Sequence, residues 1–417
     1  MNVMPLHETD GRLRIKFVIT SMPVGGAETL LLNLIRRMDQ SAFAPEVVCL
    51  KDPGVLGQEL AGEVPVYANL LAFKWDVSVL PRLAYLFRRT GTDAVITVGA
   101  GDKMFWGRLA AKLAGVPVVC SALHSTGWPD GVGRLNRWLT PLTDAFIAVA
   151  QAHAEHLALH EGFPPQRVFM IPNGVDANRF RPNHVHRISL REELGIAEEA
   201  TIVSMVAALR PEKNHEQLLT AAHEVLRQHP QTHFLIVGEG PERINIEQHI
   251  SRLGLQTRVH LLGNRNDTER ILAGSDLFCL TSRNEANPVS ILEALATCLP
   301  VVAPDVGSIR ETVLPGETGF LTKPLCAEAT ADALVQLMAN APLAAHMGRT
   351  GRQLVCQSWS LASMVQGYEN LIESIYNSKA RRGRRPGWQR PQPELQWSPT
   401  ASPADDELEP VGQSVGQ

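Results

Sequence analysis

Short apolar runs alternate with longer stretches of helical periodicity along most of this chain. Residues 14–20 (RIKFVIT) have the composition of a buried strand, and residues 27–38 (AETLLLNLIRRM) carry apolar side chains at helical spacing. A glycine turn separates the two, and the same succession of strand, turn and helix recurs as far as His160. Strands that alternate with helices in this way predict βαβ units and a parallel sheet.

A second series of the same kind begins at residues 201–209 (TIVSMVAAL) and extends to a helix over residues 327–340. The turn-rich residues 167–183 lie between the two series and mark a boundary. The pattern predicts an α/β chain with two tandem Rossmann-like, doubly wound domains, over residues 1–185 and 186–357. Ligands of such sheets bind outside the carboxyl ends of the strands, which places the expected site in the cleft between the domains.

The composition changes near residue 378. Residues 378–417 are first basic, then proline-rich and finally acidic, with few apolar side chains to bury. We therefore expect a disordered tail over this range.

The overall composition narrows the class of protein. The 417 residues are 44% hydrophobic and 20% charged, and the formal net charge of −4 gives no electrostatic basis for nucleic-acid binding. The six cysteines form no C-x-x-C pair, which indicates a reducing, cytoplasmic compartment. The polar N-terminus has no signal-peptide core, and no apolar stretch is long enough to span a bilayer. Peripheral contact with the inner face of a membrane stays open.

Residues 284–296 (NEANPVSILEALA) combine two carboxylates with a helix start. Asn287 is a favourable N-cap and Pro288 a favourable first helical residue, so the sequence predicts a helix from Pro288. The free N–H groups of that helix, which form a ready anion site, belong to Val289, Ser290 and Ile291.

The two carboxylates of this segment lie eight residues apart. Glu285 precedes the helix and is placed to accept hydrogen bonds from sugar hydroxyls, whereas Glu293 is placed to accept two bonds from a vicinal diol such as ribose. The alternative is that Glu285 complements the helix dipole and that Glu293 is a solvated helix residue.

Arg210 and Lys213 follow a predicted buried strand and precede a helix. Two cations at the carboxyl end of a strand suit a diphosphate and would stabilise charge that develops on a leaving group. An ordinary charged surface loop is the alternative.

Two glycine turns also follow predicted strands. Gly25 and Gly26 would let the backbone approach a ligand closely, with a helix N-terminus behind them. Gly238 and Gly240 occupy a similar position in the second series. Neither turn has the G-x-G-x-x-G dinucleotide fingerprint, so a plain tight turn is the alternative.

His124 ends the predicted strand over residues 117–124, where it would face the cleft and hydrogen-bond a donor sugar. A structural hydrogen bond is the alternative. The other histidines have no metal-ligand spacing, and no D-x-D motif occurs in the chain, so we expect no metal site.

Taken together, these residues resemble the retaining glycosyltransferases of family 4, also called group 1 glycosyl transferases, which have the GT-B fold. The resemblance runs from about Arg14 to Tyr376. The motifs that carry it are GGAE at 25–28, IPNGVDANRFRP at 171–182, ALRPEKN at 208–214, VGEGPER at 237–243 and NEANPVSILEALA at 284–296. Residues 358–371 (SWSLASMVQGYENL) are similar to the closing helices of the family, so residues 358–377 are expected to cross back to the N-terminal domain.

The resemblance implies a metal-independent transfer with retention, from a nucleotide-diphosphate sugar and with no other cofactor. Its usual mechanism is a front-face one, in which the departing diphosphate is the base. It implies catalytic roles for Glu285, Arg210, Lys213 and His124. It implies binding roles for Gly25, Gly26, Gly238, Gly240, Asn264, Ala286, Asn287, Val289, Ser290 and Glu293.

Within these roles the resemblance assigns the diphosphate to Arg210 and Lys213, and the ribose to Glu293. The chain departs from the family pattern at Ala286 and Ser308, where glycine is common. Both positions belong to loops near the donor sugar, so they leave the identity of the sugar open.

Three functions remain distinct at this point. The leading interpretation is a glycosyltransferase of polysaccharide, cell-envelope or glycolipid synthesis with a saccharide or lipid-linked acceptor. The alternatives are a nucleotide-sugar epimerase of the same fold and a non-catalytic module that binds sugar nucleotides. Residues 127–142 are basic, aromatic and amphipathic, which favours either contact with lipid or a mobile acceptor loop.

Overall fold

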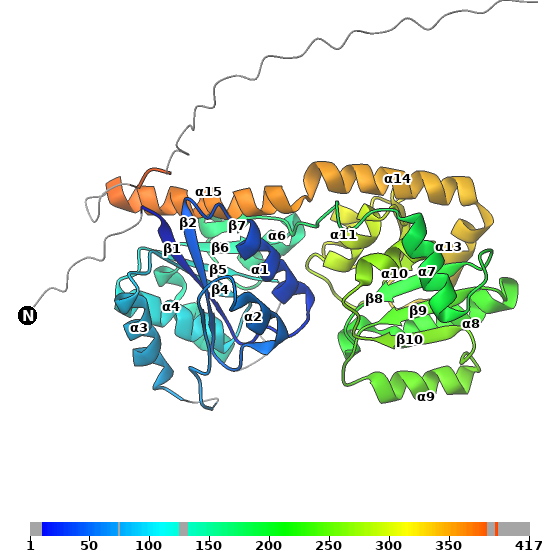
Figure 1. Ribbon diagram of the computed structural model, residues 1–417, viewed down its shortest axis with the longest axis horizontal. Helices are drawn as coiled ribbons and strands as arrows, with labels where there is room; N and C mark the ends of the chain where they lie inside the picture. Colours follow the sequence, from blue (N-terminus) through cyan, green and yellow to red (C-terminus); the bar gives the residue numbers. More distant parts are fainter. Residues whose placement is uncertain (1–10, 74–75, 125–131, 382–387, 391–417) are drawn as a thin grey trace, which may run out of the picture.

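The computed structural model describes residues 11–73, 76–124, 132–381 and 388–390. Two parallel sheets follow one another along the chain, each flanked by helices (Figure 1). This confirms the predicted α/β architecture of two doubly wound units.

The N-terminal sheet has seven strands in the order β3-β2-β1-β4-β5-β6-β7. Its strands are β1 (Leu13–Ile19), β2 (Phe43–Cys49), β3 (Val66–Tyr67), β4 (Ala94–Val98), β5 (Val118–Ala122), β6 (Ala145–Ala148) and β7 (Val168–Met170). The central strand β1 pairs in parallel with β2 and β4. Nearly all its side chains are buried, as expected for a strand that is covered on both faces.

The helices of this half connect successive strands. They are α1 (Gly26–Arg37), α2 (Gly54–Leu60), α3 (Val79–Arg89), α4 (Asp102–Ala114), α5 (Val132–Trp138) and α6 (Gln151–Leu159), with short 3₁₀ turns at η1 (Thr140–Leu142) and η2 (Pro165–Arg167). The sequence pattern did not predict α2 and β3, because seven and two residues are too few to establish a period.

The C-terminal sheet has six strands in the order β10-β9-β8-β11-β12-β13. Its strands are β8 (Ile202–Val206), β9 (His233–Val237), β10 (Val259–Gly263), β11 (Leu277–Cys279), β12 (Val301–Pro304) and β13 (Gly319–Thr322). Its helices are α7 (His184–Leu194), α8 (His215–Gln228), α9 (Arg243–Leu253), α10 (Thr268–Gly274), α11 (Val289–Ala296), α12 (Ile309–Thr312) and α13 (Ala327–Ala339), with a 3₁₀ turn at η3 (Pro211–Lys213).

Two long helices close the chain. Helix α14 (Ala341–Ser358) packs on α11, and α15 (Leu361–Lys379) extends along the N-terminal half (Figure 1). One face of α15 belongs to the N-terminal hydrophobic core, where Met364, Tyr368 and Ile372 are buried against the strands. The last helix therefore returns to the first sheet.

The predicted disordered tail needs a correction at its start. Helix α15 continues to Lys379, and Trp388 packs on Phe43 with ring centroids 5.5 Å apart. Arg390 forms ion pairs with Asp39 and Glu369. The proline-rich composition of the tail did not predict these apolar and charged contacts. Residues 382–387 and 391–417 of the predicted tail lie outside the described residues.

Candidate functional site

The strand order of each sheet defines where a ligand crevice opens. Strand β8 lies between β9 and β11, and β1 lies between β2 and β4. Because the chain winds in opposite directions from these strands, their carboxyl ends form the switch points at which ligands of such sheets bind. Arg210 and Lys213 follow β8, and Glu285 follows β11. The topology therefore directs these three residues to one crevice.

Lys213 and Glu285 form an ion pair in that crevice. Glu285 is only 9% exposed, so its carboxylate depends on this partner. Lys213 ends η3, and the hydroxyl of Thr281 donates to its main-chain carbonyl at 3.2 Å. The cation predicted to hold a diphosphate and the carboxylate predicted to hold a sugar are thus in direct contact.

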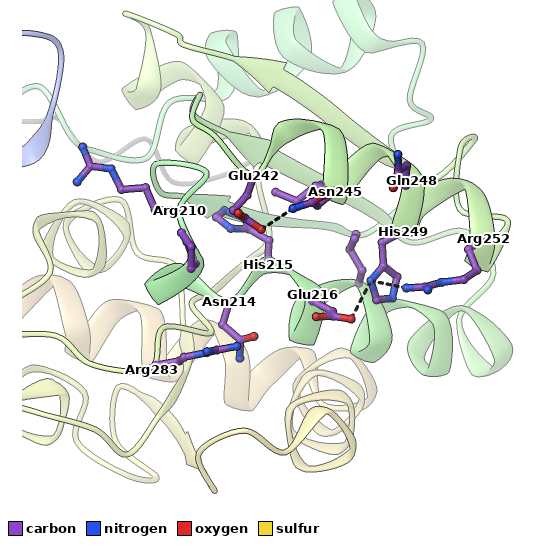
Figure 2. Close-up of a pocket in the computed structure, with 13 residues that line it drawn as sticks. Arg210, Asn214, His215, Glu216, Glu242, Asn245, Gln248, His249, Arg252 and Arg283 are labelled. Carbon is purple, nitrogen blue, oxygen red and sulfur yellow. Dashed lines mark hydrogen bonds and ion pairs between the residues drawn. The ribbon is translucent and has the colours of Figure 1, made fainter.

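Arg210 extends away from this pair. Its side chain is largely exposed, and Figure 2 shows it directed toward the N-terminal half of the molecule. There it influences Glu28 of the first glycine turn. Burial raises the pKa of Glu28, and the charges of Lys103 and Arg210 act against that rise. Arg210 and the Gly25–Glu28 turn therefore lie on facing sides of the same space.

The first glycine turn opens α1. Gly25 is the N-cap in an extended conformation, with no side-chain cap, and Gly26 is the first helical residue. A Cβ atom on Gly25 would collide with the Glu28 carboxylate. Gly25 therefore offers no side-chain oxygen to the first N–H groups of α1, although the carboxylate of Glu28 accepts a hydrogen bond from its own main-chain N–H. The absence of a side-chain cap at Gly25 is compatible with the predicted phosphate contact.

The second glycine turn has a structural cause. A Cβ atom on Gly238 or Gly240 would collide with the main-chain carbonyl of Ala207 or Leu209. The N–H of Leu209 also donates to the carbonyl of Glu239 at 3.0 Å. The two loops are thus fastened main chain to main chain directly before Arg210. Contact of these glycines with a ligand stays a prediction.

His124 lies two residues beyond β5. Its Nδ1 atom is buried and has no hydrogen-bond partner among the described residues. Burial lowers the pKa of His124 to about 4, with smaller contributions from His153 and Lys103. The imidazole is therefore neutral near pH 7, so it suits hydrogen bonding to a sugar better than proton transfer.

The predicted start of α11 needs a correction of one residue. The helix begins at Val289, and Pro288 is its N-cap with ψ 116°. The proline ring fixes φ but leaves ψ free, so Pro288 stays outside the helix. The N–H of Ile291 donates to the carbonyl of Pro288 at 3.1 Å and is not free, which leaves Val289 and Ser290 as candidate anion donors.

The loop before α11 is held from both halves of the molecule. The side-chain amide of Asn173 donates to the carbonyl of Asn287 at 2.9 Å, and the hydroxyl of Ser308 donates to the carbonyl of Ala286. Asn287 is not the N-cap. Its Oδ1 atom is buried with no partner in the described part of the chain. The sequence placed Asn173 in a family motif and Ser308 in a loop near the donor sugar. It did not predict these two contacts, because they depend on how distant segments fold together.

Glu293 is half-buried in the second turn of α11. Burial raises the pKa of its carboxyl to about 8, with Arg179 acting against this rise and Glu269 adding to it. A fully solvated Glu293 is therefore excluded. Near neutral pH the group is mostly protonated and can both donate to and accept from a diol.

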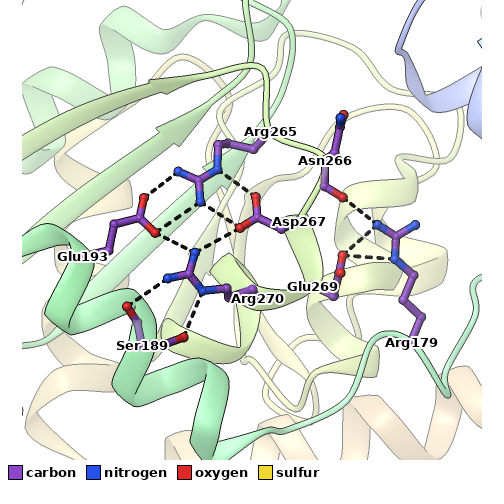
Figure 3. Close-up of polar contacts among 8 residues, drawn as sticks. All are labelled: Arg179, Ser189, Glu193, Arg265, Asn266, Asp267, Glu269 and Arg270. Carbon is purple, nitrogen blue, oxygen red and sulfur yellow. Dashed lines mark hydrogen bonds and ion pairs between the residues drawn. The ribbon is translucent and has the colours of Figure 1, made fainter. Parts of the chain in front are cut away.

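A polar network supports the loop that contains Asn264. Arg265 and Arg270 both bind Glu193 and Asp267, and Arg179 binds Glu269 at 2.7 Å (Figure 3). Asn264 itself is exposed directly after β10. Arg179, from the connection between the two halves, and Glu269 lie close enough to Glu293 for their charges to influence its pKa.

A cavity of about 550 Å³ opens between α8 and α9 (Figure 2). Its lining is mainly polar and includes Asn214, His215, Asn245 and His249. Glu285, Lys213 and Glu293 do not line it. Of the predicted site residues, Arg210 lines the cavity, and the lining residues Asn214 and Arg283 lie next to Lys213 and two residues before Glu285 in the sequence.

The described residues contain no group of three or more histidine, cysteine, aspartate or glutamate residues that could hold a metal ion. They also contain no helix that is both long and apolar enough to cross a membrane.

Family models match both halves of the chain. Residues 24–179 match the family described as glycosyltransferase family 4, and residues 186–354 match the family described as glycosyl transferases group 1.

Individual proteins agree with these matches. An Escherichia coli UDP-Gal:α-D-GlcNAc-diphosphoundecaprenol α-1,3-galactosyltransferase is 26% identical over 89% of this chain and 100% of its own length. A GDP-mannose-dependent phosphatidylinositol monomannoside mannosyltransferase of Mycolicibacterium smegmatis is 28% identical over 76% of this chain and 79% of its own.

Solved structures share the fold. HepE of Anabaena, in complex with UDP and glucose, superposes with a TM-score of 0.77 at 24% identity, over 87% of this chain and 100% of its own. WaaG, a glycosyltransferase of lipopolysaccharide biosynthesis, superposes with a TM-score of 0.68 at 16% identity, over 86% of this chain and 99% of its own. The chain therefore belongs to the group 1 glycosyltransferases of family 4, as its motifs predicted, and has the GT-B fold.

Proposed function

We propose that this glycosyltransferase moves a sugar from a nucleotide-diphosphate donor to a hydroxyl acceptor, with retention of anomeric configuration and without a metal ion. The observation that carries the proposal is the convergence of Lys213, Glu285 and the N-terminus of α11 at one switch point. Cation, helix N–H groups and carboxylate are the groups needed for a diphosphate and a sugar.

Binding of the donor exchanges partners within this set. The ammonium of Lys213 turns from Glu285 to the diphosphate, which also meets Arg210 and the N–H groups of Val289 and Ser290. The carboxylate of Glu285 then accepts hydrogen bonds from sugar hydroxyls, and neutral His124 binds the sugar from the N-terminal half. Glu293 binds the ribose.

The chemical step is a displacement on one face of the sugar. The bond between the anomeric carbon and the diphosphate oxygen breaks as the acceptor oxygen bonds to the same carbon. The departing phosphate oxygen takes the acceptor proton. Arg210 and Lys213 stabilise the charge that this oxygen gains, which is the function that a metal ion has in other transferases.

The test begins with a thermal-shift screen against UDP, GDP, ADP and their sugars. With the donor so identified, Lys213→Ala should lower turnover by about a hundredfold or more, because a charge contact to the leaving group is lost. The matched control is Lys323→Ala, an exposed lysine on the same half. Product NMR should show the anomeric configuration of the donor. Wild-type turnover in Lys213→Ala, or an inverted product, would refute the assignment.

The two alternative functions predict other results. An epimerase would convert the donor alone, without any acceptor. A binding module would give calorimetric binding of UDP or GDP and no product with any acceptor. Neither alternative is favoured by a particular contact in the structure.

We propose that the acceptor is a saccharide or a lipid-linked molecule, and that the transfer belongs to polysaccharide, cell-envelope or glycolipid synthesis. The names of the E. coli and M. smegmatis relatives specify lipid-linked acceptors. In α5 the side chain of Trp138 is 80% exposed, and Leu135 and Arg137 are also exposed. We propose that this helix rests on the inner face of a membrane, with the protein otherwise cytoplasmic. Residues 127–131 of the predicted segment 127–142 lie outside the described residues. Failure to pellet with anionic liposomes at low salt would contradict this contact.

A further inference from the structure

A carboxylate of the C-terminal half closes the end of a helix in the N-terminal half. The two oxygens of Glu311, on α12, accept hydrogen bonds from the main-chain N–H of Gln151 at 2.8 Å and of Ala152 at 2.7 Å. These are the first two residues of α6. The contact joins segments about 160 residues apart.

Helix α6 has no cap of its own. Its N-cap is Ala150, which has no side-chain oxygen, and no side-chain capping bond is formed. The first N–H groups of a helix have no partner within the helix and carry its positive partial charge. A carboxylate that accepts from two of them makes charge-assisted bonds. Glu311 therefore supplies from the other half what the local sequence of α6 lacks.

The same short segment also contacts the candidate sugar loop. Ser308, the N-cap of α12, donates its N–H to the carbonyl of Glu285 at 3.2 Å and its hydroxyl to that of Ala286. Gly307 has φ +55°, and a Cβ atom there would collide with the carbonyl of Glu285. Residues 307–311 thus bind Glu285 at one end and α6 at the other.

We propose that Glu311 is a positioning residue that couples closure of the two halves to the placement of Glu285. When the halves meet, the α6 N-terminus fixes α12, and Ser308 at the start of α12 fixes the main-chain carbonyls of Glu285 and Ala286. When they separate, α12 and the loop lose this support together. The effect on transfer rests on the function proposed above, whereas the contact itself does not.

Hydrogen exchange tests the contact directly. In the full-length protein the amides of Gln151 and Ala152 should exchange slowly, and Glu311→Ala should speed them by about tenfold or more, since two charge-assisted bonds are lost. Glu317→Ala, an exposed glutamate six residues away, is the matched control and should change nothing. Equal exchange in wild type and Glu311→Ala would overturn the proposal.

Kinetics with the donor identified in the screen tests the coupling. Glu311→Ala should lower kcat by about tenfold, while the calorimetric affinity for UDP or GDP, whichever wild type binds, stays within about twofold. Glu311→Gln keeps one acceptor oxygen, so its kcat should lie between those of wild type and Glu311→Ala. Unchanged kcat despite faster exchange, or a loss confined to nucleotide affinity, would overturn the positioning role.

A second variant removes one of the two donors of the same contact. Gln151→Pro deletes one N–H at the first helical position, where proline is tolerated, and the extended Ala150 before it suits a residue that precedes proline. Combined with Glu311→Ala, it should add little to the loss of kcat, because both changes break one contact. Additive losses would contradict the coupling. If wild type transfers no sugar at all, the proposed function fails, and the exchange experiment still decides whether Glu311 caps α6.

Discussion

The carboxyl of Glu293 should make the stability of the folded protein depend measurably on pH. Burial raises its pKa from 4.5 to about 8, so the folded protein binds a proton that the unfolded chain releases at lower pH. Stabilisation from this proton is complete below about pH 4.5 and is lost as the pH rises through 8.

We therefore predict that Glu293→Gln, which stays neutral, will remove part of the decline in thermal stability between pH 5 and 8.5. The measurement is the difference in Tm between variant and wild type across this range, since other groups titrate equally in both. Glu247→Gln, an exposed carboxyl on α9, is the control and should give a constant difference. A constant difference for Glu293→Gln as well would mean that the carboxyl is ionised throughout.

At this scale the sequence identified residues but not their contacts. Lys213 and Glu285 were both predicted from their positions after strands, yet their ion pair depends on strand order across 72 residues. Lys16 lies within a strand predicted as buried, and the structure pairs it there with Glu46 of β2. Asn173 belongs to a family motif, but neither its contact nor that of Glu311 could be predicted, because each side chain binds main-chain atoms far away in sequence.

Most elements were predicted from the periodicity of the sequence, whereas α2, β3 and α14 were not. Helix α14 contains Gly348 and Gly351, which weaken its helical signal. Both are needed for packing, because a Cβ atom on Gly348 would collide with the carbonyl of Cys298, and one on Gly351 with the side chain of Leu295. Local propensity was overruled here by the close approach of two elements.

Residues 388–390 pack on the N-terminal half, although their composition predicted a disordered tail. The indole N–H of Trp388 donates to the carbonyl of Gly11 at 2.7 Å, and Arg390 pairs with the buried Glu369. Truncation after residue 387 leaves the Glu369 carboxylate without the Arg390 guanidinium. We therefore expect the free energy of unfolding to fall by about 2 kcal/mol. This loss is smaller than the one expected for a fully buried ion pair, because Arg390 is partly exposed.

Truncation after residue 390 is the matched control and should leave the stability unchanged. Urea denaturation of the two truncated proteins and the full chain measures the difference. Equal midpoints for both truncations would show that Trp388 and Arg390 contribute nothing to the fold.

The two halves of the molecule are not independent domains that simply follow one another along the chain. The main chain of Val175 exchanges hydrogen bonds with Trp359 and Leu361, at 2.9 and 3.2 Å, so the chain crosses between the halves twice at one place. Beyond this crossing, α15 contributes six buried apolar side chains to the N-terminal core. These are Leu361, Met364, Val365, Tyr368, Leu371 and Ile372. The N-terminal unit is therefore completed by residues from the far end of the chain.

A fragment of residues 11–174 should consequently fail to fold cooperatively. Each of those apolar side chains is worth about 1.5–3 kcal/mol when buried, and their sum is comparable to the total stability of a domain, about 5–15 kcal/mol. Because Gly174 packs against Ser360 and Leu361, a short glycine-serine linker can join residue 174 to residues 359–381. This fusion should unfold in a single thermal transition by circular dichroism. The same fusion with Met364, Tyr368 and Leu371 changed to glutamine should not, and a cooperative transition in the bare fragment would show that α15 covers a core already stable without it.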